Sequence, residues 1–200
     1  MNYTGPKVRL SRKLGIELTQ KAAKVTAKKP YGPGQHGASK RRPKMSDYGR
    51  QLIEKQKLKL QYNVSEKQMR NYYKKSTQLT GNTGEILVQQ LETRLDALVY
   101  RSGLARTIYM ARQLVGHRHI TVNGKRVSIP SYQIKVNDLI AIKPKTRKNE
   151  VIKDSIRSTA PPDYIEMSKA DFSAKLLHLP SREEIPVICE VSLVVEHYSR

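Results

Sequence analysis

Apolar side chains recur at helical spacing from residue 46 onward, and this pattern predicts a small bundle of helices over residues 46–91. Ser46 stands where its hydroxyl can cap the start of one helix, and Ser65 can cap a second helix after a short break. A third helix is predicted to begin at Thr83 or Gly84, after a loop of Thr, Gly and Asn. The first of these helices has an apolar stripe on one side and a strongly basic opposite side.

The pattern changes after residue 91 and predicts a compact helix–helix–strand unit over residues 92–150. One helix is expected to end at Gly103, and Thr107 can cap the next. Two short β-rich segments then flank Asn123-Gly124, the pair favoured in a tight type I′ turn, so a β-hairpin is predicted here. Residues 138–142 have the pattern of a further strand.

Residues 1–45 contain few apolar side chains and many Lys, Arg, Gly and Pro. By itself such a segment lacks the apolar surface that offsets the entropy of ordering. We therefore expect a basic extended arm that takes its shape on a polyanion, in preference to a permanently disordered tail.

The last part of the sequence is apolar again over residues 186–196, and we expect it to pack back on the helical bundle. Cys189 lies there in a pattern typical of a buried strand, which predicts an inert core thiol. A lone cysteine excludes a disulfide within the chain and a thiolate zinc cluster. No segment approaches the roughly 20 apolar residues of a membrane span, and no secretory signal pattern is found, so no membrane partner is expected.

Charge is the dominant feature of the composition. The 200 residues include 38 Lys and Arg against 17 Asp and Glu, a formal net charge of +21 at pH 7. Residues 1–60 hold sixteen basic residues against three acids, whereas residues 151–200 hold six against eight. Such an excess favours a nucleic-acid partner, and its reversal indicates that the last fifty residues face something other than RNA.

Two short motifs could carry chemistry. Arg94-Leu95-Asp96 resembles the motif of pseudouridine synthases, in which the aspartate attacks the base. The apolar spacing around it places Asp96 in an amphipathic helix, and no segment could supply the large catalytic domain, so a structural pair with Arg94 or another basic group is preferred. His117 and His119 flank Arg118 without acidic or thiolate neighbours, so RNA contact or surface placement is preferred over a metal site. We expect no enzyme activity, no metal and no cofactor.

Motifs along nearly the whole chain resemble the family of ribosomal protein S-four, the fourth small-subunit ribosomal protein of bacteria and organelles. The segments that carry the resemblance are Tyr3-Thr4-Gly5-Pro6-Lys7, residues 31–37, Ser46-Asp47-Tyr48-Gly49, residues 54–58, residues 111–115, Val122-Asn123-Gly124, residues 129–132, residues 179–183 and Tyr198-Ser199-Arg200. One such motif would be weak, but this many in the same order form a specific signal.

The resemblance implies an α+β fold of three parts: the basic arm over residues 1–45, a helical domain over 46–91 that residues 157–200 complete, and an inserted helix–helix–β-hairpin RNA-binding domain over 92–156. It implies a structural constituent of the small ribosomal subunit that binds 16S-type rRNA, nucleates assembly of the subunit body, and contacts ribosomal protein S-five at an interface tied to translational accuracy. The expected location is the cytoplasmic ribosome, with an organellar ribosome left open.

The candidate RNA contacts are basic side chains of the arm, the helical bundle and the inserted domain. They are Lys7, Arg9, Arg12, Arg41, Arg42, Lys44, Arg50, Lys55, Lys57, Lys59, Arg70, Arg94, Arg106, Arg112, His117, Arg118 and Lys125. An alternative function is a free RNA-binding regulator of translation that binds mRNA, for example its own message.

The sequence departs from the family pattern in two respects. Some members carry an N-terminal cysteine pair that binds zinc or an iron–sulfur cluster, and Val8 and Ser11 stand at the matching positions here. Arg118 stands where many members have glycine between the two histidines, which makes a left-handed backbone there less favourable.

Overall fold

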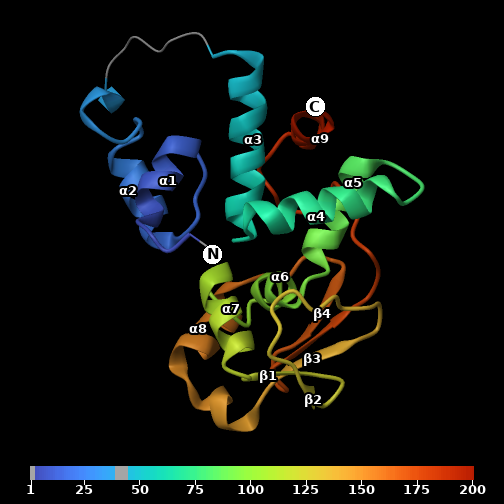
Figure 1. The fold of residues 1–200 in the computed structure, drawn as a ribbon. Coiled ribbons are helices and arrows are strands. Elements are labelled where there is room, and N and C mark those ends of the chain that lie inside the picture. The colour runs from blue at the N-terminus through green and yellow to red at the C-terminus, as the bar shows by residue number, and fades with distance from the viewer. Residues whose placement is uncertain (1–2, 39–44) are drawn as a thin grey trace. The chain divides into compact units, whose positions relative to one another are not determined.

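The computed structural model describes residues 3–38 and 45–200. The chain divides into two compact units: residues 1–78 with 187–200, and residues 79–186 (Figure 1). The first unit is helical, and the second contains a five-stranded antiparallel sheet covered by helices. The α+β class predicted from the sequence is confirmed.

These units end at residues other than the expected domain boundaries. Residues 187–200 return to the helical unit, but residues 157–186 belong to the sheet-containing unit. The reason is a pair of strands over residues 165–176 that extends the sheet and was not predicted.

The described part of the first unit is helical. Its elements are α1 (Lys7–Leu14), α2 (Gln20–Lys28), the 3-10 turn η1 (Gln35–Ala38), α3 (Asp47–Gln61), α4 (Glu66–Thr77) and α9 (Val191–Ser199).

The expectation of an extended arm is wrong for the residues that form α1 and α2. Apolar side chains of this segment share a small core with α3, made of Leu10, Leu14, Ile16, Leu18, Ile53 and Leu60. Thr19 caps α2 by accepting the Ala22 N–H at 3.2 Å. The arm orders with few apolar residues because α3 supplies the other side of this core.

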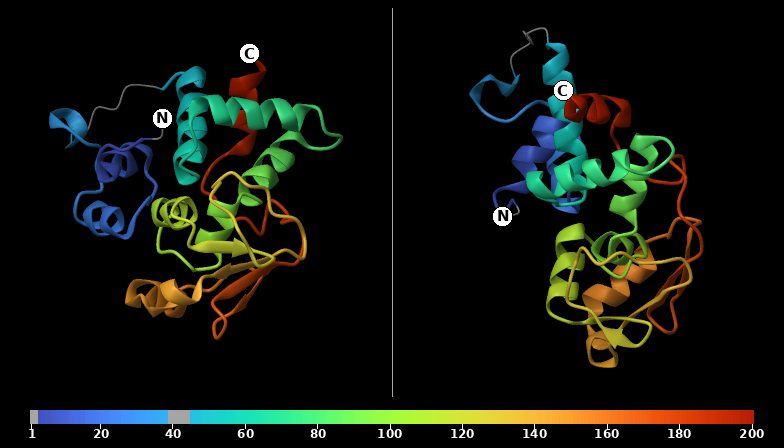
Figure 2. Two further views of the ribbon diagram at one scale, coloured as in Figure 1. Left: turned by 60° about the horizontal axis from the view of Figure 1, so that its bottom comes forward. Right: turned by 45° about the vertical axis from the view of Figure 1, so that its right-hand side comes forward.

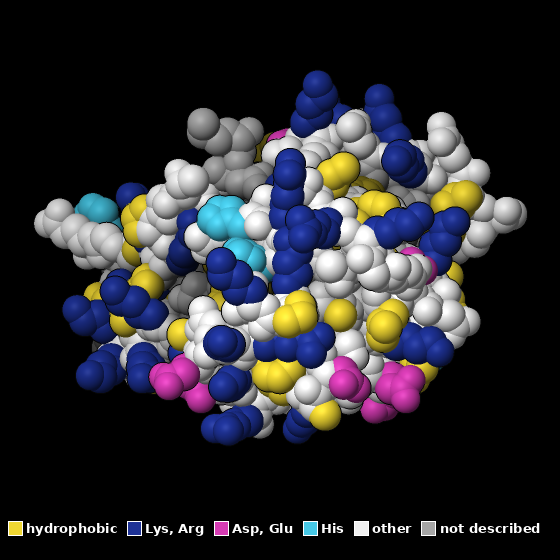
Figure 3. All heavy atoms as spheres, turned by 90° about the horizontal axis from the view of Figure 1, so that it is seen from below, with side chains coloured by type: hydrophobic (Ala, Val, Ile, Leu, Met, Phe, Trp, Pro, Cys, Tyr) yellow, Lys and Arg dark blue, Asp and Glu magenta, His cyan; other side chains and the backbone are white. Residues whose placement is uncertain are grey.

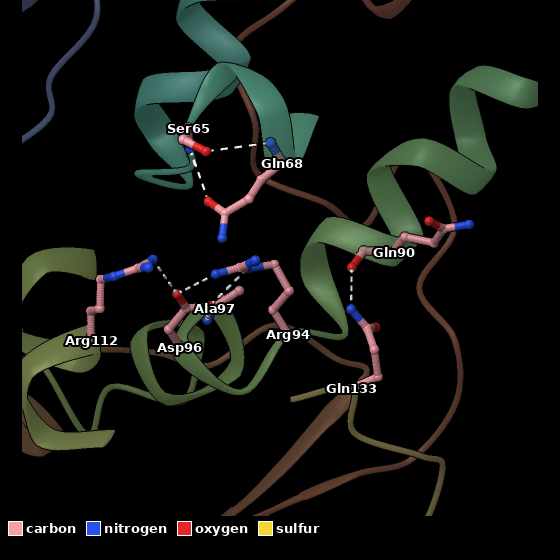
Figure 4. Close-up of polar contacts among 8 residues, drawn as sticks. All are labelled: Ser65, Gln68, Gln90, Arg94, Asp96, Ala97, Arg112 and Gln133. Atoms are coloured by element: carbon pink, nitrogen blue, oxygen red, sulfur yellow. Dashed lines mark hydrogen bonds and ion pairs between the residues drawn. The ribbon is translucent and has the colours of Figure 1, made fainter. Parts of the chain in front are cut away.

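Both predicted starts of the central helices are confirmed. The Ser46 hydroxyl accepts the Gly49 N–H at 3.2 Å and begins α3. Ser65 and Gln68 begin α4 with a reciprocal capping box, in which the two bonds measure 3.3 and 3.0 Å (Figure 4).

The C-terminal segment packs on α3, as expected. Gln51 Nε2 donates to a Glu196 carboxylate oxygen at 2.9 Å. The amide of Gln61 also exchanges two hydrogen bonds with the backbone of Ile188, at 3.1 and 3.2 Å. The prediction of a buried strand around Cys189 is wrong, because this segment is irregular and bonds to side chains of α3 instead of a neighbouring strand.

The second unit begins with α5, whose predicted start is confirmed. Its helices are α5 (Thr83–Glu92), α6 (Leu95–Arg101), α7 (Ile108–Gly116) and α8 (Glu150–Ser158), with the 3-10 turn η2 (Pro144–Lys148). Its strands are β1 (Ile120–Val122), β2 (Lys125–Arg126), β3 (Leu139–Ile142), β4 (Ile165–Ser168) and β5 (Ser173–Leu176), in the order β2-β1-β3-β5-β4.

The core of this unit lies between one face of the sheet and helices α6, α7 and α8 (Figure 2). Alternate residues of β1 and β3, such as Ile120 and Ile142, are buried there and lie opposite each other in the register. Ile152 of α8 and Leu98 of α6 complete the packing. This core fixes α7 beside the hairpin.

The predicted hairpin is confirmed in its turn type as well as its position. Asn123 and Gly124 both have positive φ, 48° and 78°, as a type I′ turn requires. Thr121 faces Arg126 across the pair of strands. Among the described residues, no helix combines the length and apolar content needed to cross a bilayer.

Candidate nucleic-acid interface

The turn from α7 to β1 projects a cation into solvent. The N–H of Arg118 donates to the Val115 carbonyl and that of His119 to the Leu114 carbonyl, both at 2.9 Å, and these bonds close the helix end. Arg118 has a left-handed backbone with φ of 61°, a conformation that is costly for a residue with a Cβ. Its side chain and that of His117 are exposed.

Three cations gather around this turn: Arg118, Arg126 of β2, and Lys143 at the end of β3. We call them the turn cluster. The pKa of Lys143 lies below its ordinary value, because of desolvation first and then the nearby charges of Arg126 and Arg118. The Lys143 N–H donates to the His119 carbonyl at 3.0 Å, which holds the end of β3 against the turn. Mutual repulsion within the turn cluster favours binding of an anion.

The sequence-based search found Arg118 but missed Arg126 and Lys143. Strand pairing is what brings them together, since Arg126 faces β1 from one side and Lys143 follows Ile142, the partner of Ile120, on the other. Their positions after predicted strands were the available signal, but the order of strands in the sheet was not known.

Arg112 of α7 is held by a buried carboxylate. Its Nη1 donates to Asp96 Oδ2 at 3.2 Å, while about a quarter of the Arg112 side chain, 24%, remains accessible (Figure 4). Asp96 itself is fully buried and also accepts the N–H of Ala97 at 3.0 Å. The protein itself therefore orients Arg112.

The prediction of an RNA contact is wrong for Arg94. This side chain is fully buried, and its Nε and Nη2 donate to the two Asp96 oxygens at 2.9 and 2.6 Å (Figure 4). The planar guanidinium of Arg94 thus donates to both carboxylate oxygens of Asp96 at once. The structural pair of Arg94 and Asp96, predicted as the alternative to catalysis, is confirmed.

Two further candidates of this unit lie at its surface. Lys125 of β2 is exposed beside the hairpin turn. Arg106, just before α7, bonds Asp154 of α8 at 3.1 Å, with both side chains partly exposed. An exposed pair of this kind contributes little to stability, so Arg106 can exchange Asp154 for a phosphate at small cost.

The lysines of α3 are more engaged than the sequence suggested. Lys55 is buried and donates to Glu66 at 3.1 Å, so its predicted RNA contact is wrong. Lys59 bonds the other Glu66 oxygen at 3.2 Å, and Lys57 bonds Glu54 at 2.6 Å. The sequence did not reveal these partners of Lys55 and Lys59, because Glu66 lies on a different helix.

Two cations of α1 bind the arm's own backbone. The Lys7 ammonium donates to the carbonyls of Tyr3 and Gly5 at 2.7 and 3.1 Å, and burial lowers its pKa. Arg12 donates to the carbonyls of Tyr31 and Gly32 at 3.1 and 3.0 Å.

The other candidates of the first unit are either exposed or outside the described residues. Arg9 and Arg70 are exposed, and Arg50 is exposed beside Asp47 at 3.1 Å. Arg41, Arg42 and Lys44 lie outside the described residues. In Figure 3, Lys and Arg side chains are spread over much of the face seen from below, with His side chains among them.

Comparison with known proteins decides the family. The model described as ribosomal protein S4/S9 N-terminal domain matches residues 2–92, and the S4 domain model matches residues 93–140. Small ribosomal subunit protein uS4 of Parabacteroides distasonis is 50% identical over 200 residues, covering 99% of this chain and 98% of that protein. The uS4 proteins of Clavibacter michiganensis and Roseiflexus castenholzii are 48% and 44% identical, covering 98% and 99% of this chain and 96% and 98% of their own lengths.

The chain belongs to the uS4 family. It is a small-subunit ribosomal protein and not an enzyme. The burial of Asp96 agrees with this, since its carboxylate is saturated by Arg94, Arg112 and the Ala97 N–H. A nucleophilic aspartate needs an accessible oxygen beside its substrate.

The cysteine positions of some uS4 proteins are filled here by residues unsuited to a metal. Val8 has no ligand atom, and Ser11 is fully buried with its hydroxyl accepting the Leu18 N–H at 3.3 Å. In the described part of the chain, no group of three or more His, Cys, Asp and Glu is placed to hold a metal. The apolar core and this hydrogen bond organise the arm of this chain.

Proposed function

We propose that the chain is a primary binder of small-subunit rRNA, which nucleates assembly of the subunit body. The observation that carries the proposal is the turn cluster of Arg118, Arg126 and Lys143, three cations held at one end of a rigid helix–hairpin unit. In duplex RNA the base edges lie in a deep major groove that side chains hardly reach. A folded junction is therefore recognised by the spacing of its phosphates. Cations on a rigid frame suit that task.

Footprinting on naked small-subunit rRNA tests this function. The purified chain should protect one folded junction, and a variant with Arg118, Arg126 and Lys143 replaced by Gln should lose that protection. Replacing Lys135, Lys153 and Lys169 by Gln is the matched control, because these exposed lysines of the same unit lie outside the turn cluster. Equal loss in the two variants would refute a localised site and leave only general charge attraction.

We further propose that the acidic C-terminal part contacts protein, with ribosomal protein S-five as the partner that links this chain to translational accuracy. Leu177 and Leu179 are 40% and 52% exposed, and carboxylates such as Glu183 lie nearby in sequence. Phosphates repel carboxylates, so this stretch suits a protein better than RNA. Crosslinking in assembled subunits tests the contact, and a misreading reporter tests its consequence.

The ribosomal role also differs in a measurable way from that of a free regulator of mRNA. The chain should co-sediment with small subunits at salt concentrations that strip weakly bound proteins. The bacterial relatives favour a cytoplasmic ribosome. A chain found in the supernatant with mRNA would instead support the regulator.

A further inference from the structure

Asn123 joins the hairpin turn to the neighbouring strand β3 through three hydrogen bonds. Its backbone N–H donates to the Leu139 carbonyl at 2.8 Å. Its side-chain oxygen accepts the Leu139 N–H at 2.9 Å, and its Nδ2 atom donates to Asp138 Oδ1 at 2.8 Å. The family resemblance and the rRNA proposal assign no chemistry to this side chain.

The side-chain carbonyl of Asn123 takes the place of a backbone carbonyl in the sheet. Val122 of β1 lies opposite Ile140 of β3, so Asn123 falls opposite Leu139 in the same register. Two residues of a hydrogen-bonded antiparallel pair exchange both N–H to carbonyl bonds. Here the Leu139 N–H bonds the side chain of Asn123, because the backbone of Asn123 bends into the turn with a φ of 48°. The side chain thereby extends the pairing of β1 and β3 by one residue.

The residue that follows Asn123 makes its side-chain amide chemically vulnerable. Asn123 is the one asparagine of the sequence that precedes a glycine. An asparagine loses ammonia when the backbone nitrogen of the next residue attacks its amide carbon, and glycine has no Cβ to shield that nitrogen. Asn123 and Gly124 are both exposed, so water reaches the turn.

We propose that Asn123 is a deamidation site, which the folded hairpin suppresses and which opening of the hairpin activates. In the first step the Gly124 nitrogen bonds Cγ of Asn123, the bond from Cγ to Nδ2 breaks, and the proton of the Gly124 nitrogen leaves with the ammonia. Water then opens the cyclic imide at one of its two carbonyl carbons. Opening at the backbone side or at the side-chain side leaves either an aspartate or an isoaspartate, whose main chain runs through Cβ and Cγ. The reaction consumes water and releases ammonia, and nothing is oxidised or reduced.

The bonds to β3 oppose the first step. The attack needs the amide carbon and the Gly124 nitrogen in a near-attack geometry. The amide of Asn123 is held at its oxygen by Leu139 and at its nitrogen by Asp138, and turning the amide toward Gly124 breaks these bonds. Asp138 is fixed in its turn, because its other oxygen accepts the Lys135 N–H at 2.8 Å. The reaction therefore proceeds through the opened hairpin, and roughly every 1.4 kcal/mol of opening free energy slows it tenfold.

Either product weakens the connection between the turn and β3. An aspartate at position 123 lacks the Nδ2 donor and places a second carboxylate against that of Asp138. An isoaspartate adds a backbone carbon to a two-residue turn, which then no longer has type I′ geometry. A chain that stays unfolded is therefore converted into a form that rebuilds the hairpin less well.

Mass spectrometry of tryptic peptides measures the deamidation rate in the full chain, incubated at mildly alkaline pH in buffer or in concentrated guanidinium chloride. In the denaturant Asn123 should react faster than Asn82, which is exposed and precedes a threonine. In buffer the rate at Asn123 should be lower by roughly tenfold or more, because the hairpin must open first. Equal rates at Asn123 in the two solutions would overturn the proposal, as would a rate in the denaturant no higher than that of Asn82.

Asp138→Ala tests the bonds that hold the amide. In buffer this variant should deamidate at Asn123 severalfold faster than the parent chain, and Asp138→Asn, which keeps an acceptor oxygen, should change the rate less. The matched control is Asp171→Ala, because Asp171 is exposed in the same unit and bonds Ser168 at 2.8 Å instead of the hairpin. An equal rise in Asp138→Ala and Asp171→Ala would show general loosening and contradict the proposal. A slower reaction in Asp138→Ala would show that Asp138 assists the attack, which would contradict it as well.

Asn123→Asp reproduces one of the two products and tests the structural consequence. It should lower the melting temperature by roughly 2–4 °C, the shift expected for about 1 kcal/mol in a chain of this size. Asn82→Asp is the control, since Asn82 caps α5 by accepting the Gly84 N–H at 2.9 Å and an aspartate caps a helix equally well. The control should melt no earlier than the parent chain, and an unchanged melting temperature in Asn123→Asp would refute the predicted weakening. None of these measurements involves RNA, so they test the deamidation site separately from the rRNA proposal.

Discussion

Among single residues, Asp96 best illustrates how a buried charge can serve a surface function. It has no access to solvent, yet through a 3.2 Å bond it orients Arg112, which does. Arg94 takes the remaining bonding capacity of the carboxylate and contributes nothing at the surface. The sequence predicted that Asp96 pairs with Arg94, which is close along the chain, or with another basic group. It did not predict that the same pair holds Arg112.

The bond between Asp96 and Arg112 predicts a change in RNA affinity opposite to the one that net charge alone predicts. Asp96→Asn removes a negative charge from an RNA-binding protein, which by charge alone would tighten RNA binding. We expect several-fold weaker binding to the rRNA junction, because Arg112 loses its orienting partner. The full removal, Asp96→Ala, should also cost about 3–5 kcal/mol of unfolding free energy, as measured by urea denaturation, since Arg94 stays buried without its partner.

The control for Asp96 is Glu166→Gln, an exposed carboxylate on β4. It removes the same charge without touching Arg112 and should leave RNA binding unchanged or slightly tighter. If the Asn and Gln variants tightened binding alike, Asp96 would have no positioning role.

Replacing Arg118 by Gly is predicted to increase stability and to weaken RNA binding. With φ at 61°, Arg118→Gly should raise the unfolding free energy by about 0.5–1 kcal/mol, because the left-handed backbone costs roughly 1–2 kcal/mol and the flexibility of glycine offsets part of the gain. RNA affinity should fall at the same time, because a cation of the turn cluster is lost. Arg118→Gln should lose affinity without gaining stability; a similar stability gain in both would contradict the backbone explanation.

For whole elements, the sequence was most informative where structure is local. Ser46, Ser65 and the Asn123-Gly124 turn were predicted correctly because each acts on residues next to it. Strands β4 and β5 were missed because β5 joins the sheet through β3, far along the chain, and because their short segments mix apolar with polar residues. Helices α1 and α2 were missed because the small core beside them is completed by Ile53 and Leu60 of α3.

Glu66 of α4 bonds both α3 and α9, and its charge predicts a pH dependence of stability. The pKa of Glu66 is lowered in the folded chain, so its contribution to stability is present above the unfolded value, about 4.5, and is lost as pH falls through the lower folded value. Glu66→Gln should therefore destabilise the chain at pH 7 and much less at pH 3. Thermal melts of both proteins across this range measure the difference, and a constant gap at all pH values would show that the charge of Glu66 is not what matters.

At the scale of the whole molecule, basic and acidic residues are concentrated in different parts of the chain. Basic residues dominate the first 150 residues, and several of them turn out to bind carbonyls or carboxylates of the chain itself, as Lys7 and Lys55 do. Acidic residues of the last fifty also bond within the chain, as Glu196 does with Gln51. A count of charges along the sequence therefore predicts the kind of partner, while the identity of each contact depends on which cations the fold leaves unoccupied.

That distinction sets the expected salt dependence of rRNA binding. Arg118 has no carboxylate partner in the described structure, so Arg118→Gln should flatten the slope of log affinity against log salt by roughly 0.7–0.9, the contribution of one phosphate contact. Arg112 shares its charge with Asp96, so Arg112→Ala should lose less affinity at low salt, and that loss should fade as salt rises. Base substitutions that preserve the RNA fold should leave both effects unchanged, because the phosphate spacing is what the cations meet. Filter-binding titrations between low and moderate salt supply the slopes. If Arg112→Ala left the slope untouched and relaxed a preference at one base, Arg112 would be reading sequence instead of backbone geometry.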